Sequence, residues 1–504
     1  MGLMGRTLSA PTGPRSDRPG GGPRHTAPLS GHASGWLVSV VTMSEPHEIS
    51  RRALLGGALA GAAAIGLAPG TASATAPARA RVGRKVGPGT LPNPSAPAGT
   101  DQIPQIKNIV VVMLENHSYD NMLGMMQGRG DGFVLGPGGR PTASNPWPKQ
   151  SATPPPVKRA TLSAFPMPNP CQQAGHPYNT WNAFWDSYAG GRNDGFVKSQ
   201  SGPVSMGYFD DTVVPFTYSL AQTFPVCDRW FCSVGAQTYP NRRFLMAGTA
   251  LGLIDDTFPA GDPPNGTIFE TLNTYGISWK NYYSNAPSAL IWLYLLGKPG
   301  IQPNLAGISQ FYTDAAAGTL PAFSLVDPDF GTSSEENPQD IQYGDVFLSQ
   351  VVNAVMDSPQ WPETILVWCY DESGGYYDHV PPPKAVKPDS VAPVLASGDH
   401  AGAYNRYGFR VPAGVVSPYA IPDYVSSVVH DHTSVLKLVE TKWNLPALTY
   451  RDAAADNLLD SVDLTGPPAF LTPPTLAPPP DPSVLAGCLS TGPGTIPPAG
   501  YVTS

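Results

Sequence analysis

Two short polar segments each follow a run of apolar residues, and their side chains are of kinds that bind metal ions. "IVVVMLENHSYDNMLG" runs from an apolar stretch into Glu115 and Asn116, and "ETILVWCYDESGG" runs into Asp371 and Glu372 in the same way. Adjacent carboxylates repel each other, so a site that holds several of them usually requires a cation. Carboxylate and amide oxygens suit a hard divalent metal, and we interpret all four residues as metal ligands.

Taken singly, each segment also fits a solvated turn. An isolated acidic pair is most often a surface feature, and Ser118 is expected to cap a helix that begins near Tyr119. The two glycines after the second pair, Gly374 and Gly375, let the backbone turn closely around the carboxylates. The metal interpretation therefore depends on the two segments lying together in the fold.

A third segment, "GAQTYPNRRFLMAG", places a hydroxyl just before a predicted helix. Pro240 fits the first helical position, and Thr238 lies next to the free N–H groups and the positive end of the helix dipole, which suit a phosphate. A threonine hydroxyl can attack phosphorus if a metal lowers its pKa. Asn116, Asn241 and Arg242 are candidates for contacts with phosphoryl oxygens. The alternative is that Thr238 is a loop hydroxyl and Arg242 a surface charge.

Three histidines are candidates for the general acid that protonates a leaving oxygen. His176 lies in the segment "CQQAGHPYNTWNAFWDSY", His379 follows the second carboxylate pair, and His432 precedes "TSVLKLVE". A lone histidine in a loop is most often merely solvated, and His432 also fits a helix cap. Both interpretations stay open for each residue at this stage.

Strand-like and helix-like stretches alternate along the middle of the chain and must position these residues. The apolar runs at 106–114 and 363–371 are predicted to be strands buried on both faces. The segments 343–359 and 431–443 have the apolar spacing of helices. This alternation predicts an α/β fold with a mostly parallel central sheet, which binds ligands beyond the carboxyl ends of its strands.

Composition excludes some classes of partner. The 504 residues carry a formal net charge of −8, with 13% charged residues, and no basic stripe is present for nucleic acid. The same charge gives no attraction to an anionic bilayer, so we expect membrane contact only as a substrate surface. Gly 53 and Pro 59 indicate many loops.

Five ordered blocks resemble a known family. "LENHSYDNMLG", "TYPNRRFLMAG", "YDESGGYYDHVPPP", "FRVPAGVVSPY" and "DHTSVLKLVE" occur in the order found in the bacterial phosphoesterase family, over residues 104–460. That family contains phosphatidylcholine-type phospholipases C and a class of acid phosphatases. The resemblance implies an alkaline-phosphatase-like α/β/α sandwich, and a hydroxyl nucleophile that forms a phospho-enzyme beside a divalent metal ion.

Carried over by motif, the resemblance implies specific roles. The first block, with Glu115 and Asn116, matches a metal and phosphate segment, Thr238 matches the nucleophile, and Asp371 and Glu372 match a second metal segment. A histidine of the family matches His176, while His379 and His432 lie inside matched blocks.

One departure concerns substrate preference. Many phospholipase-like members have a His-Pro pair where this chain has Asn337-Pro338. The leaving-group preference is therefore open, and with it the choice between phospholipase and phosphatase. We predict an exported metal-dependent phosphoric-ester hydrolase that acts on a phospholipid or a small phosphate ester. Phospholipase C is the first choice and a broad-specificity acid phosphatase the second. A secreted binding protein on a degenerate phosphatase scaffold is the alternative of another class.

The ends of the chain differ from its middle. Residues 50–76 start with Arg51-Arg52, continue with a short apolar run and end in small residues, which predicts a twin-arginine export signal. We expect 1–76 to be an upstream segment and signal peptide, 77–103 a linker, 104–465 the catalytic domain and 466–504 a Pro-rich tail. Export predicts a secreted or cell-envelope protein, in which Cys227 and Cys232 are close enough to pair.

Overall fold

The computed structural model describes residues 86–147, 160–171, 177–485 and 494–503. The described residues all belong to one compact unit. Two predictions, the export signal and the role of His176, thus concern residues outside the described ranges.

An eight-stranded mixed sheet forms the centre of the described unit, in the order β12-β6-β11-β10-β1-β9-β7-β8. The strands β10, β1, β9, β7 and β8 are parallel neighbours, whereas β11 runs antiparallel to both β10 and β6. The strands are β1 (Asn108–Leu114), β6 (Val226–Cys227), β7 (Trp279–Tyr283), β8 (Leu305–Gly307), β9 (Phe323–Asp327), β10 (Thr364–Tyr370), β11 (Ala413–Val416) and β12 (Val425–Ser426).

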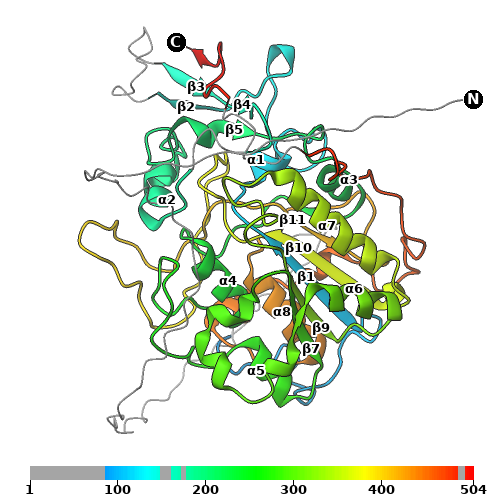
Figure 1. The fold of residues 1–504 in the computed structure, drawn as a ribbon. Coiled ribbons are helices and arrows are strands. Elements are labelled where there is room, and N and C mark those ends of the chain that lie inside the picture. The colour runs from blue at the N-terminus through cyan, green and yellow to red at the C-terminus, as the bar shows by residue number, and fades with distance from the viewer. Residues whose placement is uncertain (1–85, 148–159, 172–176, 486–493, 504) are drawn as a thin grey trace, which may run out of the picture. The chain divides into compact units, whose positions relative to one another are not determined.

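Helices cover both faces of this sheet. Figure 1 shows α6 and α7 crossing one face of the central strands, with α8 on the other side. The helices are α1 (Tyr119–Leu123), α2 (Trp181–Tyr188), α3 (Pro215–Thr223), α4 (Thr238–Ala247), α5 (Ile268–Thr274), α6 (Ile308–Ala317), α7 (Ile341–Met356), α8 (Thr433–Trp443) and α9 (Tyr450–Ala454). Every residue of β1, β9 and β10 is buried, as expected for parallel strands covered on both faces. The predicted α/β class with a mostly parallel sheet is confirmed.

Two small sheets lie beside this core. One joins β13 (Val502–Thr503), β3 (Thr161–Ser163) and β2 (Ser144–Pro146), and the other joins β4 (Phe165–Pro166) to β5 (Gly207–Tyr208). The first of them includes residues from the end of the predicted Pro-rich tail, since β13 pairs with β3.

The segment predicted as a linker is held against the domain from residue 87 onward. Asn444 ends α8 in the left-handed conformation, and its Nδ2 donates to the carbonyls of Asn93, Ala96 and Pro97. The backbone N–H of Gln102 donates to the carbonyl of Lys442. These bonds fix residues 93–102 at the end of α8.

The tail is also in contact with the domain in the described residues. The ring of Phe470 lies 4.8 Å from that of Phe224, and the indole of Trp361 donates to the carbonyl of Phe470 at 2.9 Å. Apolar side chains of the tail thus find partners on the domain although proline-rich sequence builds no core of its own.

The cysteines do not pair as the short spacing suggested. Cys227, Cys232 and Cys369 are buried free thiols, and Cys171 is disulfide-bonded. The short spacing of Cys227 and Cys232 therefore does not lead to a disulfide, and both thiols are part of the core.

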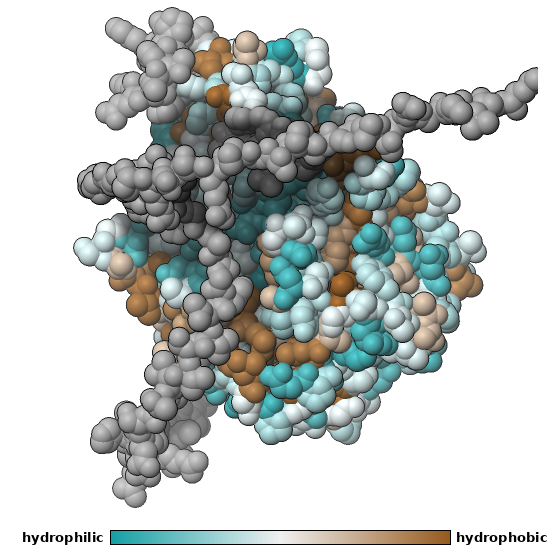
Figure 2. Space-filling view, in the orientation of Figure 1, coloured by the Kyte–Doolittle hydropathy of each residue, from teal (hydrophilic) through white to brown (hydrophobic). Residues whose placement is uncertain are grey.

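The surface is of mixed polarity on the face seen in Figure 2, where hydrophilic and hydrophobic residues are interspersed. No helix in the described part of the chain is long and apolar enough to cross a bilayer.

Candidate active site

Two neighbouring strands bring the predicted metal ligands together. β1 and β10 are parallel with Leu114 opposite Tyr370, so the residues that follow each strand emerge at the same level. Glu115, Asn116, Asp371 and Glu372 are each at most 4% exposed. The backbone N–H of Asn116 donates to Asp371 Oδ1 at 3.2 Å. The structure thus brings together all four side chains, and their role as metal ligands stays a prediction.

Backbone conformation explains the glycines after the second pair. Asn116 has φ +68° and Gly374 has φ +62°. A Cβ at Gly374 would lie 1.8 Å from the carbonyl oxygen of Asn116, so only glycine allows this approach. The N–H of Gly374 also donates to Glu372 Oε2 at 2.7 Å, which fixes that carboxylate.

Arg242 connects α4 to three strand ends. The side chain is 1% exposed, and its Nε donates to Asp371 Oδ2 at 3.0 Å. Its terminal nitrogens lie 3.6 Å from Glu115 Oε1 and 3.6 Å from Asp327 Oδ1. The guanidinium therefore contacts carboxylates at the ends of β10, β1 and β9, whereas the sequence predicted contacts with phosphoryl oxygens.

Asp327 was missed in the sequence although a signal was present. It ends β9, the strand beside β1, and is fully buried. Its oxygens accept from the N–H and hydroxyl of Ser288 at 2.7 and 2.6 Å and from Asn281 Nδ2 at 2.7 Å. The rule that ligands follow the carboxyl ends of buried strands applies equally to the segment "AFSLVD".

The site carries more negative charge than Arg242 offsets. Burial raises the pKa of Glu115, Asp371 and Glu372, and the positive charge of Arg242 only partly opposes this at Glu115 and Asp371. For Glu372, the neighbouring Asp371 raises the pKa further. The ionised forms of these three carboxyl groups therefore have too little positive charge nearby to stabilise them.

Two more carboxyls lie within electrostatic reach. Burial, together with repulsion from Asp371, raises the pKa of Glu336 to about 7 and that of Asp256 to about 6. Glu115 Oε2 is buried without a hydrogen-bond partner among the described residues. The many carboxylate oxygens and the unpaired Oε2 of Glu115 are suitable ligands for a divalent cation.

Thr238 is the first residue of α4 and is 7% exposed. Pro240 is thus the third helical residue and not the first, because the helix starts two residues earlier than predicted. The N–H of Tyr239 donates to Asp256 Oδ1 at 2.7 Å, which satisfies one of the free groups at the helix start. The side-chain amide of Asn241 is hydrogen-bonded to the backbone of 234–237 and holds the loop that precedes the helix.

His432 is fixed inside the protein. It is fully buried, its Nε2 donates to the carbonyl of Asp371 at 2.6 Å, and its Nδ1 accepts from the indole of Trp230 at 3.3 Å. Burial lowers its pKa to about 4. A neutral imidazole with a hydrogen bond at each ring nitrogen is better suited to holding the backbone at Asp371 than to delivering a proton.

His379 belongs to a second polar cluster. Its Nδ1 lies 2.8 Å from Asp120 Oδ2 and its Nε2 3.3 Å from Asp131 Oδ1. Asp120, Asp378 and His379 lie close enough together to suit a metal ion, but Arg410 donates to both aspartates at 3.0 Å. The guanidinium already supplies the positive charge of this cluster.

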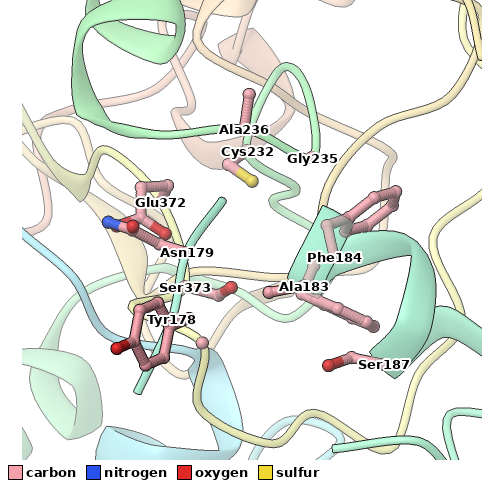
Figure 3. Close-up of a pocket in the computed structure, with 12 residues that line it drawn as sticks. Tyr178, Asn179, Ala183, Phe184, Ser187, Cys232, Gly235, Ala236, Glu372 and Ser373 are labelled. Carbon is pink, nitrogen blue, oxygen red and sulfur yellow. The ribbon is translucent and has the colours of Figure 1, made fainter. Parts of the chain in front are cut away.

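A small pocket adjoins Glu372. Figure 3 shows Asn179 beside Glu372 at one side of it, with Phe184 of α2 at the other. Asn179 Nδ2 donates to Glu372 Oε1 at 2.7 Å and to Asn116 Oδ1 at 3.0 Å. Sequence reasoning missed Asn179, because no local pattern connects it to residues so distant in the chain.

Comparison with known proteins adds independent information. The family model described as "Phosphoesterase family" matches residues 106–446. Non-specific phospholipase C6 of Arabidopsis thaliana is 31% identical over 396 residues, covering 72% of this chain and 73% of that protein. Phospholipase C A of Mycobacterium tuberculosis is 29% identical over 413 residues, with 72% of this chain and 78% of that protein covered.

Among solved structures, one described as a protein in the alkaline phosphatase superfamily, from Vibrio parahaemolyticus, covers 73% of this chain and 72% of its own. The TM-score is 0.37 at 12% identity, which is too low to carry an argument.

Proposed function

The chain belongs to the Phosphoesterase family and is a phosphoric ester hydrolase, and we propose that it is a phospholipase C with Thr238 as its nucleophile. One observation carries the assignment of Thr238. Residues four apart lie on the same face of a helix, so Thr238 lies on the face of α4 from which Arg242 reaches Asp371 and Glu115. Thr238 is thereby on the side of the helix that faces the carboxylates, which supports it as the nucleophile.

The chemistry follows from that placement. Thr238 Oγ would lose its proton and bond to phosphorus while the ester bond to diacylglycerol breaks, and the leaving diacylglycerol oxygen takes up a proton. Water would then attack phosphorus, the bond between Thr238 Oγ and phosphorus would break, and one proton of the water would return to Oγ as the phosphorylated head group leaves. Glu115, Asp371 and Glu372 are the residues suited to hold a divalent cation, which would lower the pKa of the hydroxyl and offset charge on the phosphate. His176 remains a predicted proton donor.

Replacing Thr238 tests the assignment. We expect Thr238→Ala to lower turnover of phosphatidylcholine by at least about 1000-fold, because the attacking oxygen is lost. Thr238→Ser keeps a hydroxyl and should retain measurable turnover. Both variants should melt within a few degrees of the unmodified protein. An active alanine variant would rule out Thr238 as the nucleophile.

A broad phosphomonoesterase is the second candidate, and the residue at 337 favours it. The amide of Asn337 is bonded to the hydroxyl of Tyr376 at 3.0 Å and offers no titratable group where many phospholipase-like members have histidine. Comparing phosphatidylcholine with p-nitrophenyl phosphate, each with and without a chelator, separates the two functions. Preference for the small monoester would favour the phosphatase, and activity unaffected by chelator would contradict the metal.

Export is part of the proposal. The paired Arg51 and Arg52, the short apolar run and the small residues after it support the twin-arginine route and a secreted or cell-envelope location.

A further inference from the structure

Asn179 joins the two halves of the candidate metal site from a third segment. Its Nδ2 donates both to Glu372, which follows β10, and to Asn116, which follows β1. It lies just before α2 and lines the pocket shown in Figure 3.

The donor character of this contact fixes how Asn116 is turned. An amide NH₂ only donates, so Asn116 must present Oδ1 to Asn179. The backbone of Asn116 cannot readjust, because it has φ +68°, donates to Asp371 and packs closely against Gly374. The side-chain amide of Asn116 is therefore held in one of its two orientations.

In that orientation the Nδ2 of Asn116 is left over. The residue is 2% exposed, and this nitrogen has no hydrogen-bond partner among the described residues. A buried N–H₂ group without an acceptor is costly, so an acceptor from outside the chain is expected to meet it. An acceptor brought by a ligand would satisfy it, and Glu115, Asp371 and Glu372 already supply the negative ligands for a cation.

We propose that Asn179 is a positioning residue, which orients the amide of Asn116 so that its Nδ2 donates to a phosphoryl oxygen of the substrate. The inference rests on the proposed function and deepens it. It keeps both roles predicted for Asn116, because Oδ1 accepts from Asn179 with one lone pair and has a second lone pair for a cation, while Nδ2 donates to the ester.

Inorganic phosphate and Mn²⁺ serve as separate probes. Asn116→Asp keeps the acceptor oxygen and replaces the donor by an anionic oxygen, so we expect the inhibition constant of inorganic phosphate to rise by about 100-fold or more, because a hydrogen bond to a charged group is lost and the new carboxylate repels the phosphate. The affinity for Mn²⁺, measured by calorimetry, should not fall, since an additional carboxylate does not weaken a cation site. Weakened Mn²⁺ binding with unchanged phosphate inhibition would overturn the inference.

A double-mutant cycle tests whether Asn179 acts through Asn116. We expect Asn179→Ala to weaken phosphate inhibition about tenfold, and the double variant with Asn116→Asp to be no worse than Asn116→Asp alone. Fully additive effects would overturn the proposal. Asn182→Ala is the matched control, because this asparagine of α2 is bonded to Asp399 and to the backbone of His400 instead; it should leave phosphate inhibition unchanged.

These measurements are distinguishable from a test of the reaction itself. Phosphate inhibition can be followed with p-nitrophenyl phosphate, and phosphate binding can be followed by calorimetry without turnover. A protein that binds phosphate as expected but does not hydrolyse phospholipid would contradict the phospholipase assignment and leave the role of Asn179 supported.

Discussion

At the scale of single residues, surroundings decide what a side chain does. Four candidates were chosen from the sequence by residue type and motif alone: Thr238, Arg242, His379 and His432. The structure separates them, because His432 is locked between a carbonyl and an indole while His379 is held by aspartates and Arg410. The role of each histidine depends on hydrogen-bond partners in distant segments of the chain, which the local sequence does not reveal.

The burial of His432 predicts how stability depends on pH. Its folded-state pKa is about 4, below the ordinary value of 6.5, so between these values only the unfolded chain binds the proton. The stability it contributes is thus present above pH 6.5 and falls as the pH drops toward 4. We expect His432→Gln to flatten the urea-unfolding profile over this range, by up to about 3 kcal/mol.

The same variant tests the catalytic alternative. His117 is buried with a similar pKa and stays in both proteins, so the difference between profiles isolates His432. Turnover of His432→Gln, corrected for the folded fraction, should stay within about tenfold of the unmodified protein if His432 has only a structural role. Loss of a general acid would typically lower turnover by about 100-fold or more. A loss of 100-fold or more would restore His432 as a general acid.

At the scale of elements, the loop after β10 depends on one close approach. We expect Gly374→Ala to abolish most activity, since the added Cβ would lie 1.8 Å from the carbonyl of Asn116 and the φ of +62° disfavours alanine. Kinetics with p-nitrophenyl phosphate would measure the loss. Gly261→Ala is the control, because no heavy atom lies within 4 Å of its Cβ position. Equal activity in the two variants would contradict this account.

Elements with a continuous apolar run were predictable, and the contacts between elements were not. The segments 106–114 and 363–371 were identified as buried strands because β1 is apolar after Asn108 and β10 is mostly apolar after Thr364. The start of α4 was placed at Pro240, two residues late, because a proline is tolerated anywhere in a first turn. Asp327 could have been found from its place at the end of a buried strand, whereas Asn179 joins the site only through contacts with Glu372 and Asn116, which periodicity does not predict.

At the scale of the whole molecule, proline-rich ends are part of the folded unit wherever the structure describes them. We expect Phe470→Ala to destabilise the protein by about 1 to 3 kcal/mol, since the ring packs on Phe224 beside Trp361. Thermal melting would show the loss, with catalysis at 25 °C unchanged. Leu471→Ala, at a position 53% exposed, should melt like the unmodified protein; an equal drop in both would contradict specific packing.

The guanidinium of Arg242, shared by the ends of β10, β1 and β9, also constrains how this site can evolve. Loss of the arginine alone would leave Asp371, Glu115 and Asp327 facing one another inside the protein. Loss of one carboxylate would leave the buried guanidinium with fewer negative partners. We therefore expect single substitutions here to be deleterious, and viable variants to carry changes on several strands at once. Sequence change at these four positions should accordingly be concerted, with strong epistasis between segments far apart in the chain.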